Sequence, residues 1–413
     1  MNENSFILPY FHTSTEELSL KVKKGEAVSL PETVKACYND GATADVKVKW
    51  DKTDIDPSSV GGDILTGTLC PDAYPNPFIL ERADPYVIKH SGKYYFTASY
   101  PAFKSAENGY DRIILRESDT LLGLADAEEK EIWHAHESGI MARHIWAPEI
   151  HFIDGKWYIF FAAGEKDAVW NIRPYVLVCD GDPMKDEWTE LGKMQASVGD
   201  EVSFNSFSLD MTYFEHKGRH YLIWAEIIGD SSLFMAEINP AEPNRLISKP
   251  ILLTKPEYDW EKVVFRVNEG ASVLKHGDKI FVFFSASGTG SEYCMGVVYA
   301  DESSDLMDKN SWTKVSSPVL QTSDLEGESG PGHNSFTVDD NGNTVIVYHS
   351  RPASHLEGKC GTYWEESLYD PCRHARIKRV YFTKDGTPII RMKDSDWVNP
   401  ELSEVKCKII AEG

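Results

Sequence analysis

The feature that most constrains the fold is a turn glycine followed by aromatic or β-branched residues, a pattern that recurs five times. The glycines are Gly92, Gly155, Gly218, Gly277 and Gly342, and successive copies are separated by 63, 63, 59 and 65 residues. Another short strand-like run precedes each glycine, which is the signature of a β-hairpin. Each unit has room for two further strands. Five such units around an axis predict an all-β, five-bladed β-propeller, whereas a β-sandwich with irregular hairpins would not need the near-even spacing.

Residues 1–73 belong to none of the five units. Short runs of alternating residues, such as Leu18–Lys23 and Val34–Tyr38, are separated by turn clusters there. These runs predict a small, separate β-sandwich.

The repeats therefore divide the chain into three parts. We expect a β-sandwich domain with a short N-terminal tail at 1–73, a propeller at 74–396 and a C-terminal tail at 397–413. The tail contains the alternating segment Val405–Ile410, which could supply the sandwich with an additional strand.

Three carboxylates share one position relative to the turn glycine. Asp84, Asp210 and Glu269 each lie 8 residues before the glycine of their unit. If every hairpin opens with the innermost strand of its blade, these positions face the same end of the central axis. A single acid near a strand start is usually solvated or caps a turn, but three in one register predict a shared pocket. Burial of unpaired acids costs stability, so such a pocket indicates chemistry.

Glycoside hydrolysis requires a set of acids of this kind. One protonated acid donates a proton to the leaving oxygen, and one ionised carboxylate attacks or activates water. A third carboxylate can raise the pKa of the acid through like-charge repulsion.

Charge and composition exclude other classes of protein. The formal net charge of −23 argues against a nucleic-acid partner, which requires a basic surface. No apolar run is long enough to span a membrane. The first residues show no signal peptide, so we expect a cytoplasmic protein, or a secreted one whose leader was removed. The seven scattered cysteines favour reduced thiols, although Cys360 and Cys372 flank one loop and could pair.

The chain resembles glycoside hydrolase family 43 over roughly residues 74–395, and residues 18–68 resemble a bacterial immunoglobulin-like domain. The family resemblance is carried by Ala83-Asp84-Pro85-Tyr86, Ile145-Trp146-Ala147-Pro148-Glu149-Ile150-His151, Ser208-Leu209-Asp210, Val267-Asn268-Glu269-Gly270, Tyr293-Cys294-Met295-Gly296, Gly330-Pro331-Gly332-His333-Asn334-Ser335-Phe336 and Arg373-His374-Ala375-Arg376. Each motif alone is common, and the combination is specific.

The resemblance implies a role for each acid. Asp84 would be the general base that activates water, Glu269 the general acid, and Asp210 the residue that raises the pKa of Glu269 and orients it. It also implies an inverting reaction, in which base and acid stand about 6.5–9.5 Å apart to leave space for water.

Four further residues are expected to form the rest of the site. Trp146 would stack against the sugar, and Arg376 would donate hydrogen bonds to a substrate hydroxyl or to Asp210. Glu149, which lies 6 residues before Gly155 and therefore out of register, would support the substrate-binding wall without reacting. The resemblance places His333 at the pocket floor, where the family often holds Ca²⁺ or a water cluster. No organic cofactor is expected.

The sequence predicts an inverting exo-glycosidase that releases terminal xylose or arabinofuranose from xylo- or arabino-oligosaccharides of plant cell walls. These pentoses overlay closely, so β-xylosidase and α-L-arabinofuranosidase both stay open. The alternatives are an endo-arabinanase, a retaining relative and a non-catalytic sugar-binding propeller. The sequence leaves the oligomeric state open.

Overall fold

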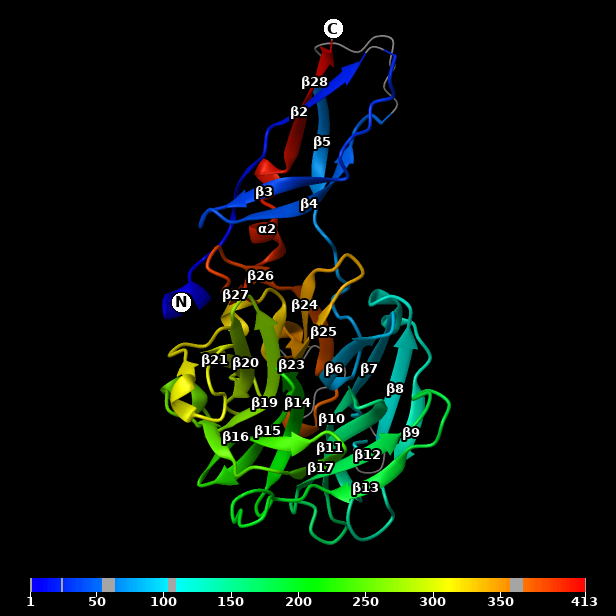
Figure 1. The fold of residues 1–413 in the computed structure, drawn as a ribbon, viewed down its shortest axis with the longest axis vertical. Helices are drawn as coiled ribbons and strands as arrows, with labels where there is room; N and C mark the ends of the chain where they lie inside the picture. Colours follow the sequence, from blue (N-terminus) through cyan, green and yellow to red (C-terminus); the bar gives the residue numbers. More distant parts are fainter. Residues whose placement is uncertain (1, 24, 54–63, 103–108, 357–366, 413) are drawn as a thin grey trace. The chain divides into compact units, whose positions relative to one another are not determined.

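The computed structural model describes residues 2–23, 25–53, 64–102, 109–356 and 367–412 (Figure 1). The chain divides into two compact units, Tyr74–Val380 and a unit that combines Met1–Ala73 with Tyr381–Gly413. Cys360, and with it the alternative of a pair with Cys372, lies outside the described residues. Within the described parts, no helix combines the length and apolar character needed to cross a bilayer.

The larger unit is a β-propeller of five antiparallel sheets, as the repeats predict, although blade 5 has three strands in the described residues where four were expected. Blade 1 consists of β6 (Ala83–His90), β7 (Lys93–Ser99), β8 (Arg112–Ser118) and β9 (Lys130–His134), and blade 2 consists of β10 (Arg143–Ile153), β11 (Lys156–Gly164), β12 (Arg173–Cys179) and β13 (Thr189–Lys193). Blade 3 consists of β14 (Ser208–His216), β15 (Arg219–Ile228), β16 (Asp230–Asn239), β17 (Glu242–Leu246) and β18 (Ile251–Thr254). Blade 4 consists of β19 (Asn268–His276), β20 (Lys279–Ala286), β21 (Cys294–Asp301) and β22 (Thr313–Lys314), and blade 5 consists of β23 (Glu328–Val338), β24 (Thr344–Pro352) and β25 (His374–Arg379).

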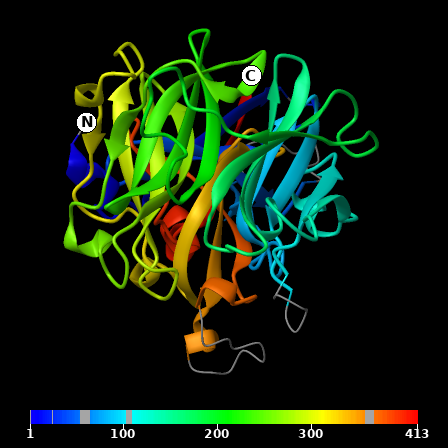
Figure 2. The ribbon, with the colours of Figure 1, turned by 90° about the horizontal axis from the view of Figure 1, so that it is seen from below.

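The blades close into a ring. Each innermost strand packs against the innermost strands of its neighbours, and β23 of the last blade packs against β6 of the first. Figure 2 shows the orange strands of blade 5 between the yellow strands of blade 4 and the blue-cyan strands of blade 1. Ile79, which precedes β6, also forms an antiparallel bridge with Ala375 of β25. The start of the propeller chain therefore pairs with its last strand.

Every innermost strand is interrupted by a β-bulge at the equivalent position. The register shifts between Ala83 and Tyr86, Trp146 and Glu149, Leu209 and Thr212, Glu269 and Ser272, and Gly332 and Ser335. One residue in each interval has a left-handed φ: Asp84 (53°), Ala147 (46°), Asp210 (55°), Gly270 (57°) and His333 (44°). Non-glycine residues rarely adopt this conformation, and bulges of this kind re-aim side chains at functional sites.

The smaller unit contains a six-stranded sheet in the order β1-β3-β4-β5-β28-β2. Its strands are β1 (His12–Thr15), β2 (Leu18–Lys23), β3 (Thr33–Tyr38), β4 (Thr43–Trp50), β5 (Ile64–Cys70) and β28 (Glu404–Glu412). The C-terminal segment expected to be able to add a strand does so, because β28 pairs antiparallel with β5 and parallel with β2.

The propeller ends at residue 380, before the boundary expected at 396. The hairpin of β26 (Tyr381–Phe382) and β27 (Pro388–Ile389) and the helix α2 (Asp394–Trp397) belong to the smaller unit. Tyr381 donates a hydrogen bond to Asp40 Oδ1 at 2.9 Å, and its ring lies 4.9 Å from that of Tyr38. Burial of these aromatic rings against the N-terminal sheet explains the earlier boundary.

Short helices occupy the connections. They are η1 (Glu3–Phe6), η3 (Leu122–Ala125), η4 (Asp259–Glu261), η5 (Lys309–Ser311), η6 (Thr322–Asp324), α1 (Ala353–Leu356), η7 (Ser367–Tyr369) and η8 (Pro400–Leu402).

Candidate active site

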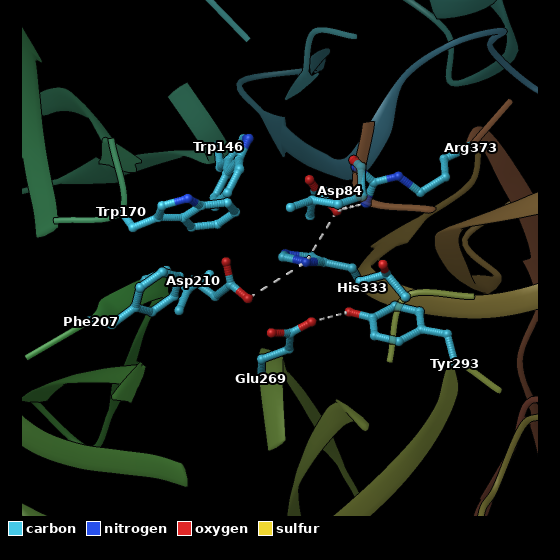
Figure 3. A pocket seen from close by; sticks show the side chains of 12 residues that line it. Asp84, Trp146, Trp170, Phe207, Asp210, Glu269, Tyr293, His333 and Arg373 are labelled. Atoms are coloured by element: carbon cyan, nitrogen blue, oxygen red, sulfur yellow. Dashed lines mark hydrogen bonds and ion pairs between the residues drawn. The ribbon is translucent and has the colours of Figure 1, made fainter. Parts of the chain in front are cut away.

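A pocket of about 120 Å³ at the bulged end of the propeller axis brings the three predicted acids together (Figure 3). Its walls are formed by Asp84, Trp146, Trp170, Phe207, Leu209, Asp210, Glu269, Thr289, Tyr293, His333, Leu368 and Arg373. The acids come from blades 1, 3 and 4, so the equivalence of the hairpins does place them at one cavity.

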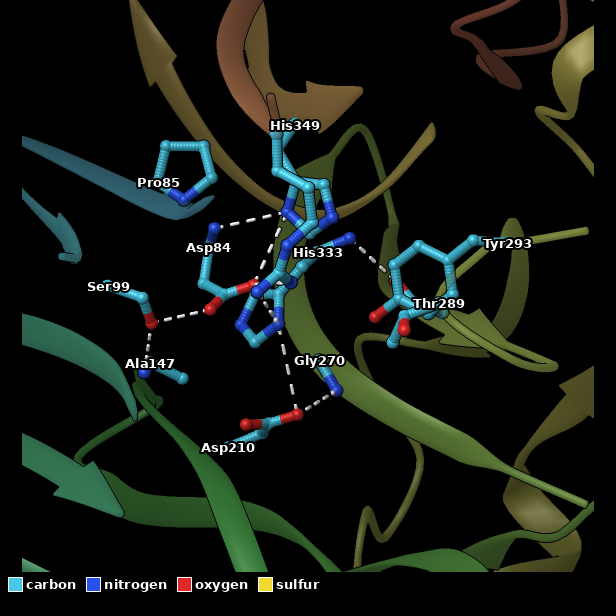
Figure 4. Close-up of polar contacts among 12 residues, drawn as sticks. Asp84, Pro85, Ser99, Ala147, Asp210, Gly270, Thr289, Tyr293, His333 and His349 are labelled. Carbon is cyan, nitrogen blue, oxygen red and sulfur yellow. Dashed lines mark hydrogen bonds and ion pairs between the residues drawn. The ribbon is translucent and has the colours of Figure 1, made fainter. Parts of the chain in front are cut away.

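Asp84 is a buried carboxylate surrounded by hydrogen-bond donors and positive charge (Figure 4). Ser99 Oγ donates to its Oδ2 at 2.5 Å, and its Oδ1 lies 3.5 Å from Arg373 Nη1 and 3.4 Å from His333 Nδ1. Burial alone would raise the pKa of this carboxyl, but His333, Arg373 and His349 outweigh burial and hold the pKa below its usual range. Asp84 is therefore ionised and suited to accept a proton.

The surroundings of Glu269 raise its pKa, whereas those of Asp84 lower the pKa of that carboxyl. Tyr293 OH donates to its Oε1 at 2.8 Å. Burial raises the pKa of Glu269 to about 7; the hydrogen bond from Tyr293 opposes this rise, and the negative charge of Asp84 adds to it. A carboxyl with this pKa is protonated for part of the time at neutral pH and can donate its proton.

The pKa of Asp210 depends on the charge of Glu269. Gly270 N–H donates to Asp210 Oδ2 at 3.0 Å, which links the third-blade acid to the residue that follows the fourth-blade acid. Burial raises the pKa of Asp210 well above its usual value, and the charges of Glu269 and Asp84 raise it further. The two carboxyls therefore resist simultaneous ionisation and retain a proton between them.

Replacement of Asp210 by asparagine is expected to move the alkaline limb of the pH–rate profile to lower pH. That limb reports loss of the proton that the two carboxyls retain between them, and removal of one ionisable carboxyl removes the repulsion that resists their simultaneous ionisation. The measurement is kcat/KM against pH for the variant and the wild type. Asp278→Asn, at an exposed side chain in the β19–β20 turn, is the matched control, and an unshifted limb in Asp210→Asn would remove Asp210 from this role.

Neighbouring blades hold the bulges in place. Three bulge N–H groups donate to side chains on the second strand of the preceding blade: Asp84 to His349 Nδ1 at 3.1 Å, Ala147 to Ser99 Oγ at 2.8 Å and His333 to Ser285 Oγ at 2.7 Å. Ser99 thus connects the bulge of blade 2 to the carboxylate of Asp84. Figure 4 shows the first two of these contacts.

Trp146 lies in the pocket wall, as predicted for a sugar-stacking residue. Its ring stacks on His144 with centroids 4.3 Å apart, and Trp170 stands beside it at 6.1 Å. Trp170 is about half exposed, so this wall is apolar and open to the mouth. Apolar ring faces of this kind suit the C–H face of a sugar.

His333 reaches the pocket floor, where the resemblance also implied calcium. Its Nδ1 lies 3.4 Å from Asp84 Oδ1 and 3.8 Å from Asp210 Oδ2, and burial lowers the pKa of its imidazole. Among the described residues, the cluster of histidine, cysteine and acidic groups compact enough to bind an ion directly is His355, Asp370 and Cys372, and it does not include His333. The donors around His333 thus do not fit directly bound Ca²⁺, which prefers six to eight oxygens. A water-mediated ion stays a prediction.

Two residues assigned to the substrate-binding wall are not among the pocket residues. Glu149 is buried, and its carboxyl shares a hydrogen bond with His151 Nε2 at 2.9 Å. Arg376 is buried as well, where its Nη1 donates to Asn76 Oδ1 and its Nε lies 4.0 Å from Glu328. Both lie farther along their strands than the bulged end, so their side chains support the blades.

The sequence reasoning missed Arg373 and Tyr293. Arg373 donates to Tyr110 OH at 2.8 Å and faces Asp84, which makes it the positive charge of the pocket. It immediately precedes β25, which begins at the bulged end of blade 5, whereas Arg376 comes three residues later. The position of an arginine at the start of that strand is the signal that could have identified it.

The fold and the acid cluster together define a glycoside hydrolase of the β-propeller class. Residues 74–388 match Glycosyl hydrolases family 43, and residues 15–69 match the Bacterial Ig-like domain (group 4). The chain belongs to glycosyl hydrolase family 43 and has an N-terminal immunoglobulin-like domain.

Named relatives match most of this chain. An extracellular exo-α-(1→5)-L-arabinofuranosidase of Streptomyces avermitilis is 44% identical over 334 residues, which cover 79% of this chain and 65% of the relative. A protein of the same name from Streptomyces chartreusis is 44% identical over 70% of this chain and 85% of its own length. The crystal structure of an α-L-arabinofuranosidase from Lactobacillus brevis has 42% identity and a TM-score of 0.67, and the match covers 76% of this chain and 95% of that one.

Proposed function

We propose that this protein is an exo-acting α-L-arabinofuranosidase that removes terminal arabinofuranose from arabino-oligosaccharides with inversion. The observation that carries the proposal is that one pocket holds both an ionised Asp84 and a Glu269 that retains its proton for part of the time. The lowered pKa keeps Asp84 ionised, and the pKa of about 7 keeps Glu269 partly protonated near neutral pH, which are the protonation states that a base and an acid need.

The reaction follows from these protonation states. Asp84 removes a proton from a water molecule as the water oxygen bonds to the anomeric carbon. The bond from that carbon to the glycosidic oxygen breaks, and Glu269 gives its proton to the departing oxygen. Ser99 and Arg373 hold Asp84, and Tyr293 holds Glu269. The products are free arabinose and the shortened saccharide, with Asp84 protonated and Glu269 ionised until solvent resets them.

The relatives support arabinose over xylose. The Streptomyces and Lactobacillus proteins, at 42–44% identity, are named arabinofuranosidases, whereas a xylan β-1,4-xylosidase of Bacillus halodurans shares 16% identity and supports the fold alone. An endo-arabinase of Bacteroides thetaiotaomicron, at 17% identity, likewise supports only the fold. A non-catalytic propeller is disfavoured because all three acids are present in the pocket.

We also propose that the protein acts outside the cell. The two Streptomyces relatives are named extracellular, which favours the secreted alternative over the cytoplasmic one. Arabino-oligosaccharides of plant cell walls are encountered there.

The test is a substrate panel followed by product analysis. We expect hydrolysis of 4-nitrophenyl α-L-arabinofuranoside and release of arabinose from α-1,5-arabinotriose, with 4-nitrophenyl β-D-xyloside turned over at least about tenfold more slowly. Inversion of an α-linkage predicts that NMR detects the β-anomer of arabinose first. A parallel series with chelator tests the water-mediated calcium ion, whose removal should lower activity. Xylose release as the faster reaction, or initial release of the α-anomer, would contradict the proposal.

A further inference from the structure

The segment Val263–Phe265, which we call the rim turn, has an unusual backbone. Phe265 N–H donates to Val263 O at 2.8 Å, which closes a γ-turn around Val264. Val264 has φ 65°. A γ-turn with positive φ is rare and strained, and a β-branched residue is least suited to its centre. Strain of this kind persists where the surroundings enforce it and tends to occur at functional sites.

The rim turn also exposes apolar side chains. The exposed fractions of Val263, Val264 and Phe265 are 46%, 71% and 62%. Single exposed apolar residues are common, but three in succession on a strained turn form a small apolar surface that suits a ligand.

Hydrogen bonds attach the rim turn to the mouth of the pocket. Val263 N–H donates to Ser287 Oγ at 3.0 Å, and Gly288 N–H donates to Val263 O at 2.9 Å. Val264 lies directly over Gly288, because a Cβ on that glycine would come within 3.0 Å of Val264 Cβ. The next residue, Thr289, lines the pocket.

The other end of the rim turn is held by blade 3. Arg266 Nε pairs with Asp230 at 2.6 Å, and Ser231 N–H donates to Arg266 O. After Val267 the chain enters β19, whose second residue is Glu269. The rim turn is therefore fixed at both ends and stands on the blade that supplies the general acid.

We propose that the rim turn is the platform for the leaving-group sugar, an inference that rests on the proposed function. Glu269 must reach the glycosidic oxygen, and this oxygen joins the terminal sugar to the rest of the saccharide. The remaining saccharide therefore leaves the pocket on the side of Glu269, toward Thr289 and the rim turn. Val264 and Phe265 contact the apolar face of the second sugar and select arabino-oligosaccharides over compact arabinosides.

The experiment compares two substrates that share the terminal arabinose. α-1,5-Arabinotriose has a leaving-group sugar, and α-L-arabinofuranosyl fluoride has none. Phe265→Ala is expected to lower the ratio of kcat/KM for arabinotriose to kcat/KM for the fluoride by roughly tenfold. Val264→Gly should also lower the ratio and should not lower the thermal midpoint, because glycine adopts positive φ without strain.

Val338→Ala is the matched control. Val338 is 38% exposed and ends β23 at the hairpin turn, away from the bulged end, so its variant should keep the wild-type ratio. If both rim-turn variants were active and kept the wild-type ratio of kcat/KM for the two substrates, the platform would be overturned and the proposed function would stand. Failure of the wild type to release arabinose from either substrate would overturn the proposed function, and the platform with it.

Discussion

Replacement of Glu269 by glutamine is expected to lower kcat for arabino-oligosaccharides by about 10²–10⁴-fold. Glutamine preserves the shape of the side chain and can still accept the hydrogen bond from Tyr293 OH, but it has no proton of suitable acidity for the glycosidic oxygen. Steady-state kinetics with α-1,5-arabinotriose measure the loss.

The same variant separates acid catalysis from a structural defect. A 2,4-dinitrophenyl arabinofuranoside has a leaving group that needs little protonation. The loss of kcat on this substrate should therefore be at least about tenfold smaller than the loss on arabinotriose. Glu302→Gln, at a side chain that is 45% exposed, controls for loss of one negative charge. Equal losses on both substrates, or normal activity on arabinotriose, would show that Glu269 is not the acid.

Replacement of Asp84 by asparagine is expected to reduce kcat by about 10²–10⁴-fold, equally for good and poor leaving groups. The base acts on water in both cases, so a better leaving group cannot compensate for its loss. Asparagine can still accept from Ser99 and keep the backbone contact with His349, so the bulge is preserved. The measurement is kcat for the nitrophenyl and natural substrates of the variant.

Two controls accompany the Asp84 variant. Azide attacks the anomeric carbon without needing a base, so it should restore the turnover of activated substrates by Asp84→Asn. It should not restore the turnover of natural substrates by Glu269→Gln. The wild-type pH–rate profile should stay flat on the acidic side until well below neutral pH, because the pKa of Asp84 is lowered and the base stays ionised. If a better leaving group restored the turnover of Asp84→Asn and azide did not, the general base would have to be another residue.

The three acids could be located from sequence because the hairpin turn is a fixed reference. Along a strand, each residue has a defined rise and direction, so a constant spacing from the turn glycine leads to an equivalent place in each blade. The bulge itself carries little sequence signal, since Asp84-Pro85, Asp210-Met211 and Glu269-Gly270 share no pattern. Counting could therefore locate the residues without revealing the left-handed backbone that aims Asp84 and Asp210.

Residues beyond the bulge were harder to assign. Glu149 lies two residues nearer the turn than Ala147, which occupies the position of Asp84 and Asp210 in blade 2, and this offset takes its side chain away from the bulged end. Arg376 and Arg373 occur in one motif, and only the direction of β25 distinguishes the one at the pocket end. The propeller boundary differs because Tyr381 and Ile389 are largely apolar residues that either unit could have buried.

The hydrogen bond from Asp84 N–H to His349 spans 265 residues, and this has a consequence for biosynthesis. Asp84 is made early and emerges from the ribosome long before the strand that holds its bulge. A nascent or truncated chain that ends before β24 would carry all three carboxylates, yet Asp84, the proposed general base, would lack the partner that fixes its orientation. Hydrolytic activity should therefore appear only when the fifth blade has been added and the ring has closed.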